Sequence, residues 1–164
     1  MGRSIPLRLF VVAALAAGTL TVISVAGPSS AATKVACGKE VGGKPVTKAG
    51  VITVKATLTL CPASVGTKGT SVTTIKGSNP PISKTTWANG KGTTTQKVKY
   101  TDVTKTKGRG KCKVGESRLI ITGTTTAGTG AALKVIPKGS VGKSNICLRK
   151  DSTSYLEPGT KATF

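Results

Sequence analysis

The chain has 164 residues, four cysteines, no histidine and a formal net charge of +20 at pH 7. The lack of histidine removes the commonest general base and the commonest metal ligand, which argues against catalysis and against metal sites. The five acids are dispersed and predict no catalytic pair: Glu40, Asp102, Glu116, Asp151 and Glu157. We therefore expect a non-enzymatic protein without a metal or cofactor.

Residues 1–32 have the features of a secretory signal peptide. Two arginines precede an apolar run over residues 9–26, and Ser30 and Ala32 fit the small-residue positions before a cleavage site. The run is near the lower length limit for spanning a bilayer, so an uncleaved anchor is the alternative. Cleavage leaves one domain, residues 33–164, whose formal charge is +18 because the two arginines are lost. We expect this domain to be extracellular, without a transmembrane segment, and monomeric.

The exported part is poor in large apolar side chains. Val, Ile, Leu and Phe make up 26 of its 132 residues, a fraction at which high charge predicts disorder. Its four cysteines predict two disulfides, each stabilising by about 3 kcal/mol. Pairing of Cys37 with Cys61 and of Cys112 with Cys147 is favoured, since each joins segments near in sequence. A Cys61–Cys112 bridge around Trp87, as in immunoglobulin domains, is the alternative.

In chain order, the first predicted element is a short strand near residues 34–37. The clearest follows at 51–61, VITVKATLTLC, where apolar residues alternate with threonine and lysine, the period of a strand with one buried face. Further strands are predicted at 70–75, 96–103, 117–126, 132–136, 145–149 and the C-terminal KATF. Turns rich in Gly, Pro and Asn separate these strands.

Seven or eight short strands at intervals of about ten residues indicate an all-β fold. We expect a small disulfide-stabilised β-sandwich, immunoglobulin-like with Greek-key connections, and not a closed barrel. The stretch PKGSVGKS, residues 137–144, only partly resembles a phosphate-binding loop, because proline stands where the first glycine is required. Its Ser140-x-x-Lys143 spacing would need a helix, which the neighbouring glycines disfavour.

The stretch TKTKGRGKCK, residues 104–113, has a cation at every second position. If extended, these cations would share one face at intervals of about 6.6 Å, with two lysines of the same parity upstream. Gly108 and Gly110 instead favour a turn that would gather the charge at a loop tip. The candidate binding residues are Lys97, Lys99, Lys105, Lys107, Arg109, Lys111 and Lys113.

The preferred functional hypothesis is that these cations bind anionic polymers or glycans of the cell envelope or surroundings, through counterion release. Alternatively, the lysines only protect strand edges and maintain solubility. Sequence-specific nucleic-acid binding is not expected, because aromatic residues are scarce and lysine greatly outnumbers arginine. The second hypothesis is a small-ligand carrier or protein-binding module that uses loops around Trp87, expected to be half-buried beside the Asn89–Gly90 turn.

Overall fold

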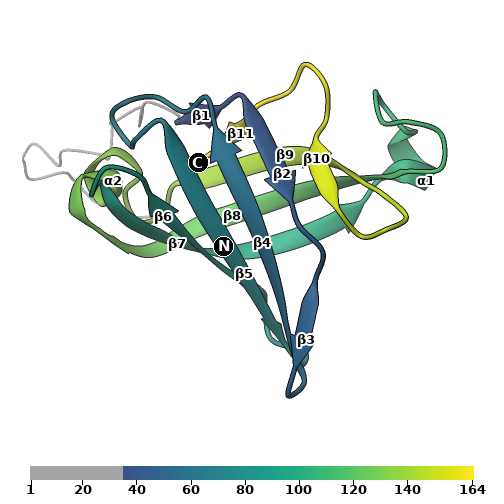
Figure 1. Ribbon diagram of the computed structural model, residues 1–164, viewed down its shortest axis with the longest axis horizontal. Coiled ribbons are helices and arrows are strands. Elements are labelled where there is room, and N and C mark those ends of the chain that lie inside the picture. The colour runs from purple at the N-terminus through teal and green to yellow at the C-terminus, as the bar shows by residue number, and fades with distance from the viewer. Residues whose placement is uncertain (1–34) are drawn as a thin grey trace, which may run out of the picture. The chain divides into compact units, whose positions relative to one another are not determined.

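A computed structural model describes residues 35–164 (Figure 1). The predicted signal peptide, residues 1–32, lies outside the described residues. No helix in this part of the chain has the length and apolarity needed to cross a membrane.

The described chain is all-β, with two short helices. Its strands are β1 (Ala36–Cys37), β2 (Lys39–Gly42), β3 (Val46–Lys48), β4 (Val51–Thr59), β5 (Lys68–Lys76), β6 (Ile82–Trp87), β7 (Gly92–Asp102), β8 (Ser117–Thr129), β9 (Val141–Leu148), β10 (Ser154–Leu156) and β11 (Ala162–Thr163). The helices are α1 (Thr104–Lys107) and α2 (Gly130–Val135).

Eight antiparallel strands form a closed barrel in the order β9-β10-β2-β4-β5-β6-β7-β8, and pairing of β8 with β9 closes the ring. The expected sandwich of two packed sheets is therefore replaced by a single rolled sheet. The physical reason is the long strand β8, which pairs with β7 on one side and with β9 on the other. A register shift at Thr95/Gln96 interrupts the β7–β8 ladder, as β-bulges do where a sheet bends.

The alternation predicted at 51–61 is confirmed in β4, where Val54, Ala56 and Leu58 face the barrel interior. The prediction fails at both ends of the pattern: Ile52 is exposed and does not line the cavity, and Leu60 lies beyond the strand and is exposed. A strand predicted at 132–136 is also wrong, because this segment belongs to α2. Its run of alanines favours a helix, and Ala132 is fully buried.

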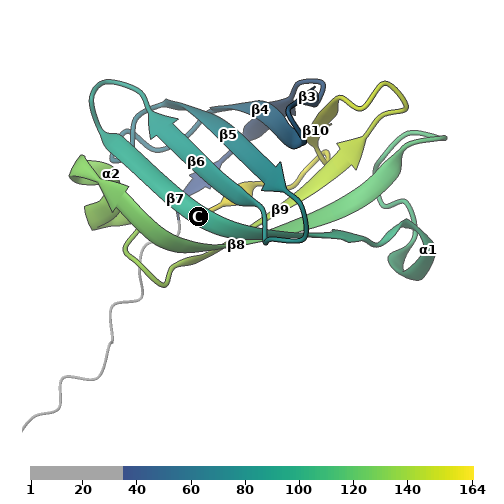
Figure 2. The same cartoon turned by 90° about the horizontal axis from the view of Figure 1, so that it is seen from below.

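One end of the barrel is closed by a compact apolar core. Strands β1 and β11 pair with each other, and the disulfide Cys37–Cys61 joins β1 to the chain just after β4. Helix α2 covers the same end, while α1 lies at the opposite end of the barrel (Figure 2). Gly69 gives the Trp87 ring room here, since an added Cβ would lie 3.0 Å from that ring.

The second disulfide joins Cys112 to Cys147, so the favoured pairing is confirmed and the Cys61–Cys112 alternative is excluded. No cysteine is free in residues 35–164. Cys147 lies on β9 between the inward-facing residues Ile146 and Leu148, and it therefore points to the outside of the barrel. This bond holds the β7–β8 loop against the outer wall.

Candidate functional site

The barrel encloses a cavity of about 200 Å³. Inward-facing residues of all eight ring strands line it, together with the C-terminal Phe164. Pro45 and Ser152, from the β2–β3 and β9–β10 loops, also line it, which places its open side at the end opposite Trp87. A cavity of about 150 Å³ can hold benzene, so this one has room for a molecule with one ring and a short substituent.

The interior changes character along the barrel axis. Nearest the closed end lie three fully buried threonines, Thr85, Thr94 and Thr125. The next layer is polar but internally paired: Ser71 and Ser83 share a hydrogen bond of 2.7 Å. Toward the open side the lining is apolar and only partly buried: Val54, Ile75, Leu119, Ile121 and Leu148. A ligand in the cavity would therefore meet an apolar wall first.

Glu40, on β2, places a carboxyl group in this lining. Its Oε2 atom is buried and has no hydrogen-bond partner among the described residues. Burial raises the pKa of Glu40 above its usual 4.5, while a hydrogen bond with Ser144 acts in the opposite direction. An unpaired carboxyl oxygen in an apolar cavity is costly to the fold, which makes it a candidate ligand contact.

Tyr100 lies on β7, which is the fourth strand from β2 around the ring and so stands opposite Glu40. Although 36% of Tyr100 is exposed, burial of its phenol is the main cause that raises its pKa. A hydrogen bond with Thr73 lowers this pKa, and the charge of Glu40 raises it. Part of the Tyr100 side chain is thus exposed to solvent while its hydroxyl is shielded, as expected for a ring at the rim of the cavity.

The four other acids all have partners outside the cavity. Asp102 and Asp151 are exposed and accept hydrogen bonds from the backbone N–H groups of Thr104 and Thr153. Glu116 accepts hydrogen bonds from the backbone N–H of Lys113 and from Tyr155 Oη, the latter at 2.6 Å. The pKa of Glu116 is lowered chiefly by the bond from Tyr155. Asp102 and Glu116 thus form hydrogen bonds with different groups and not with each other.

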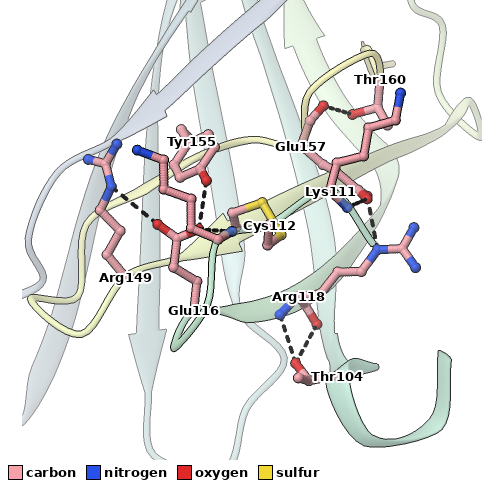
Figure 3. Close-up of a disulfide and its surroundings, with 11 residues drawn as sticks. Thr104, Lys111, Cys112, Glu116, Arg118, Arg149, Tyr155, Glu157 and Thr160 are labelled. Carbon is pink, nitrogen blue, oxygen red and sulfur yellow. Dashed lines mark hydrogen bonds and ion pairs between the residues drawn. A yellow bond between two sulfur atoms is a disulfide. The ribbon is translucent and has the colours of Figure 1, made fainter. Parts of the chain in front are cut away.

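The basic stretch does not form an extended row. Lys105 and Lys107 lie on α1, and the chain then turns through Gly108 and Gly110, whose φ angles are 68° and 58°. The turn expected from these glycines is confirmed. Beyond it, the disulfide fixes Cys112 to the wall (Figure 3).

The side chains of all seven candidate cations are exposed. Lys97 and Lys99 lie on the outward face of β7, separate from the loop in sequence, and border a shallow hollow on the outer wall. The loop thus concentrates five cations, and none of them lines the cavity.

Trp87 is wrongly predicted as a half-buried loop residue. It is 2% exposed, its Nε1 donates to Thr94 Oγ1 at 3.1 Å, and its ring packs edge-to-face on Phe164 with centroids 5.2 Å apart. It belongs to the core at the closed end, although Phe164 connects it to the cavity lining. Ligand contact through loops around Trp87 is therefore not supported.

Two further features can be assigned. Among residues 35–164, the metal-capable side chains that come together are Cys112, Glu116 and Cys147, and the disulfide occupies both sulfurs. The segment from Ser140 to Lys143 enters strand β9, so the helix that the S-x-x-K spacing requires is absent there. The candidate ligand contact that the sequence did not reveal is Glu40, because β2 was not recognised as a strand.

No protein-family model, no curated protein and no solved structure matches this chain.

Proposed function

We propose that this protein is an exported carrier that binds a small, largely apolar molecule inside its barrel. The observation that carries the proposal is the cavity of about 200 Å³, open at one end and lined by apolar side chains around one carboxyl group. Binding sites for small molecules usually combine an apolar lining with a few polar groups that fix orientation. Two disulfides are compatible with an oxidising, extracellular location.

The proposal moves the ligand site from the loops around Trp87 to the barrel interior. The scaffold supports this placement, since most of the lining residues lie on paired strands of the barrel. Little reorganisation is then needed for binding, which favours affinity for small ligands.

A cavity-filling substitution tests the proposal with a matched control on the same strand. Ala56 faces the cavity and its neighbour Thr57 is exposed on the outer wall. Amide NMR spectra of the oxidised protein are recorded during titration with 2-phenylethanol, an uncharged probe with one ring. Ala56→Phe is expected to weaken binding by about tenfold or more, because the new ring occupies the ligand volume. Thr57→Phe is expected to bind like the parent.

Two results would overturn the carrier proposal. One is the absence of shifts for cavity-lining residues such as Ile121 in the parent. The other is equal weakening by Ala56→Phe and Thr57→Phe, since binding would then occur on the surface.

A second candidate function is adhesion to anionic polymers or glycans of the cell envelope, favoured by where the acids lie. Glu40 is in the cavity, Glu157 is buried, and Glu116 is largely covered, so Asp102 and Asp151 are the exposed carboxylates of the described chain. The outer surface is consequently almost purely positive. Such a surface binds polyanions through counterion release with little specificity.

Elution from a sulfated resin distinguishes a focused patch from spread charge. One variant replaces the five cations of residues 105–113 by serine. The matched control replaces five exposed lysines elsewhere: Lys39, Lys55, Lys68, Lys76 and Lys84. Both variants lose five positive charges, so elution of the loop variant at clearly lower salt supports the patch. Equal elution of the two variants contradicts it.

A further inference from the structure

We propose that the cavity binds a small organic amine in its ammonium form, with the Glu40 carboxylate as its counter-ion. This inference rests on the proposed carrier function and defines the chemical class of the ligand. It is argued from the unpaired carboxyl oxygen, from the partners of the other acids, and from the shape and lining of the cavity.

The first observation is the missing partner of Glu40. Its Oε2 atom is buried without a hydrogen bond, and neither ion pair of the described residues includes it. The charged or titratable residues that line the cavity besides Glu40 are Tyr100 and Lys143. Lys143 is exposed and makes no ion pair with Glu40. The cavity therefore contains a buried acceptor without a partner in the described chain, and a bound donor could satisfy it.

The second observation is the contrast with the other four acids. Each of them accepts a backbone N–H, and Glu116 and Glu157 also pair with arginine. Residues 33–164 contain 23 lysines and arginines, so cations suitable for pairing with Glu40 are abundant in the chain. No cation of the described residues pairs with Glu40, so a ligand could supply one, and an ammonium group is the simplest organic donor.

The third observation is the surroundings of the carboxyl group. Tyr100 and Phe164 place two aromatic rings in the same lining, and aromatic rings attract ammonium groups. The apolar wall toward the open end suits a hydrocarbon or single-ring body. From the volume of the cavity, we expect a ligand of roughly ten heavy atoms.

Anionic and uncharged ligands would interact with Glu40 in other ways. A carboxylate ligand would be repelled by ionised Glu40, and the one lysine that contributes to the lining, Lys143, is exposed to solvent. An uncharged alcohol or amide could hydrogen-bond to Glu40 but would form no ion pair with it. Comparing three ligands of similar size and different charge therefore separates the classes.

The test measures binding of phenethylamine, 2-phenylethanol and phenylacetate by calorimetry at neutral pH. A salt concentration of about 0.15 M screens the positive surface, while the buried pair is screened much less. The oxidised parent is compared with Glu40→Gln, which keeps the shape and removes the charge. Asp151→Asn is the matched control, because it removes one exposed carboxylate that does not itself line the cavity. Circular dichroism and Trp87 emission check that each variant is folded.

We expect phenethylamine to bind the parent most tightly and to lose about tenfold or more in affinity in Glu40→Gln, as for a charge-assisted hydrogen bond. Asp151→Asn should bind it like the parent, and Glu40→Gln should bind 2-phenylethanol within about threefold of the parent. Stronger binding of the alcohol than of the amine, or equal amine affinity in Glu40→Gln, overturns the amine inference and leaves the carrier function standing. If none of the three probes binds the parent, both proposals fail.

Discussion

Arg118 Nε donates a hydrogen bond to Glu157 Oε2 at 2.9 Å, on the outer wall of the barrel. The other oxygen of the same carboxylate accepts the backbone N–H of Lys111, also at 2.9 Å (Figure 3). Glu157 follows β10, Arg118 lies on β8, and Lys111 belongs to the loop between β7 and β8. One buried carboxylate thus ties the basic loop to two strands of the ring, beside the Cys112–Cys147 bond.

Glu157→Ala is predicted to destabilise the protein by about 3 kcal/mol, because it leaves the Arg118 charge and the Lys111 N–H without their partner. Glu157→Gln, which keeps an acceptor of the same shape, should cost less. Urea denaturation of the oxidised variants measures both values. A loss below about 1 kcal/mol for Glu157→Ala would mean that solvent replaces the carboxylate without penalty.

Removing the Cys112–Cys147 bond by a double Cys→Ser substitution is predicted to cost about 3 kcal/mol, as expected for a loop closed over a separation of 35 residues. Because this bond lies outside the barrel, binding of 2-phenylethanol should persist in the folded variant. The same change at Cys37–Cys61 removes buried sulfurs from the core at the closed end and should cost at least as much. Chemical denaturation with a parallel NMR titration checks both expectations.

Glu40→Gln is predicted to raise stability at alkaline pH. The folded protein holds the Glu40 proton more tightly than the unfolded chain, because burial raises its pKa. The resulting stabilisation is complete below the unfolded pKa of about 4.5 and is lost as the pH rises through the folded pKa. The variant does not ionise and avoids this loss. Tm should therefore exceed that of the parent at about pH 8 and approach it at about pH 4.

Asp151→Asn is the control in the same experiment, because the pKa of Asp151 is lowered whereas that of Glu40 is raised. Hydrogen bonds from Thr153 lower the pKa of Asp151 in the folded protein. The ionised carboxylate therefore stabilises the fold above the pKa of the unfolded chain, and this stabilisation is lost as the pH falls through the pKa of the folded protein. The variant should not gain stability at alkaline pH. An alkaline gain in Tm for Asp151→Asn equal to that of Glu40→Gln would point to net charge as the cause, and not to burial of Glu40.

Thr94→Val is predicted to destabilise by about 1–3 kcal/mol, although valine has nearly the same shape as threonine. Thr94 is fully buried and its hydroxyl accepts the Trp87 N–H, which would be left unpaired. Thr86→Val, on the exposed face of β6, is the control and should change stability by less than about 0.5 kcal/mol. Urea denaturation monitored by Trp87 emission checks the difference, and equal stability of the two variants would contradict the prediction.

The β class, the disulfide pairing and the inward face of the central part of β4 could be predicted because they depend on local features. Alternation of apolar and polar residues is visible along 51–61, and each cysteine pair joins segments close in the chain. Closure of the barrel could not be predicted in this way. The same alternation is found in sandwiches and barrels, and only the long-range pairing of β8 with β9 separates them.

The candidate site could not be predicted from the sequence for a related reason. Glu40 lies in a strand of four residues beside a glycine-rich stretch that reads as a turn, so its inward position was not visible. Its partners on the wall, such as Ser144, come from strands far along the chain. Trp87 was misplaced because the neighbouring Asn89–Gly90 turn suggested exposure, whereas α2 and Phe164 cover the ring.

The pairing of β8 with β9 has a consequence for the lysines of the outer wall. Each ring strand has a hydrogen-bonded neighbour on both sides, so the ring offers no template on which a second chain could add a strand and begin a fibril. Outward cations such as Lys84 and Lys97 are therefore not needed there as guards against strand addition. Protection of open strand edges therefore does not account for the positive charge on the ring, whereas solubility and attraction to anionic surroundings both remain as explanations.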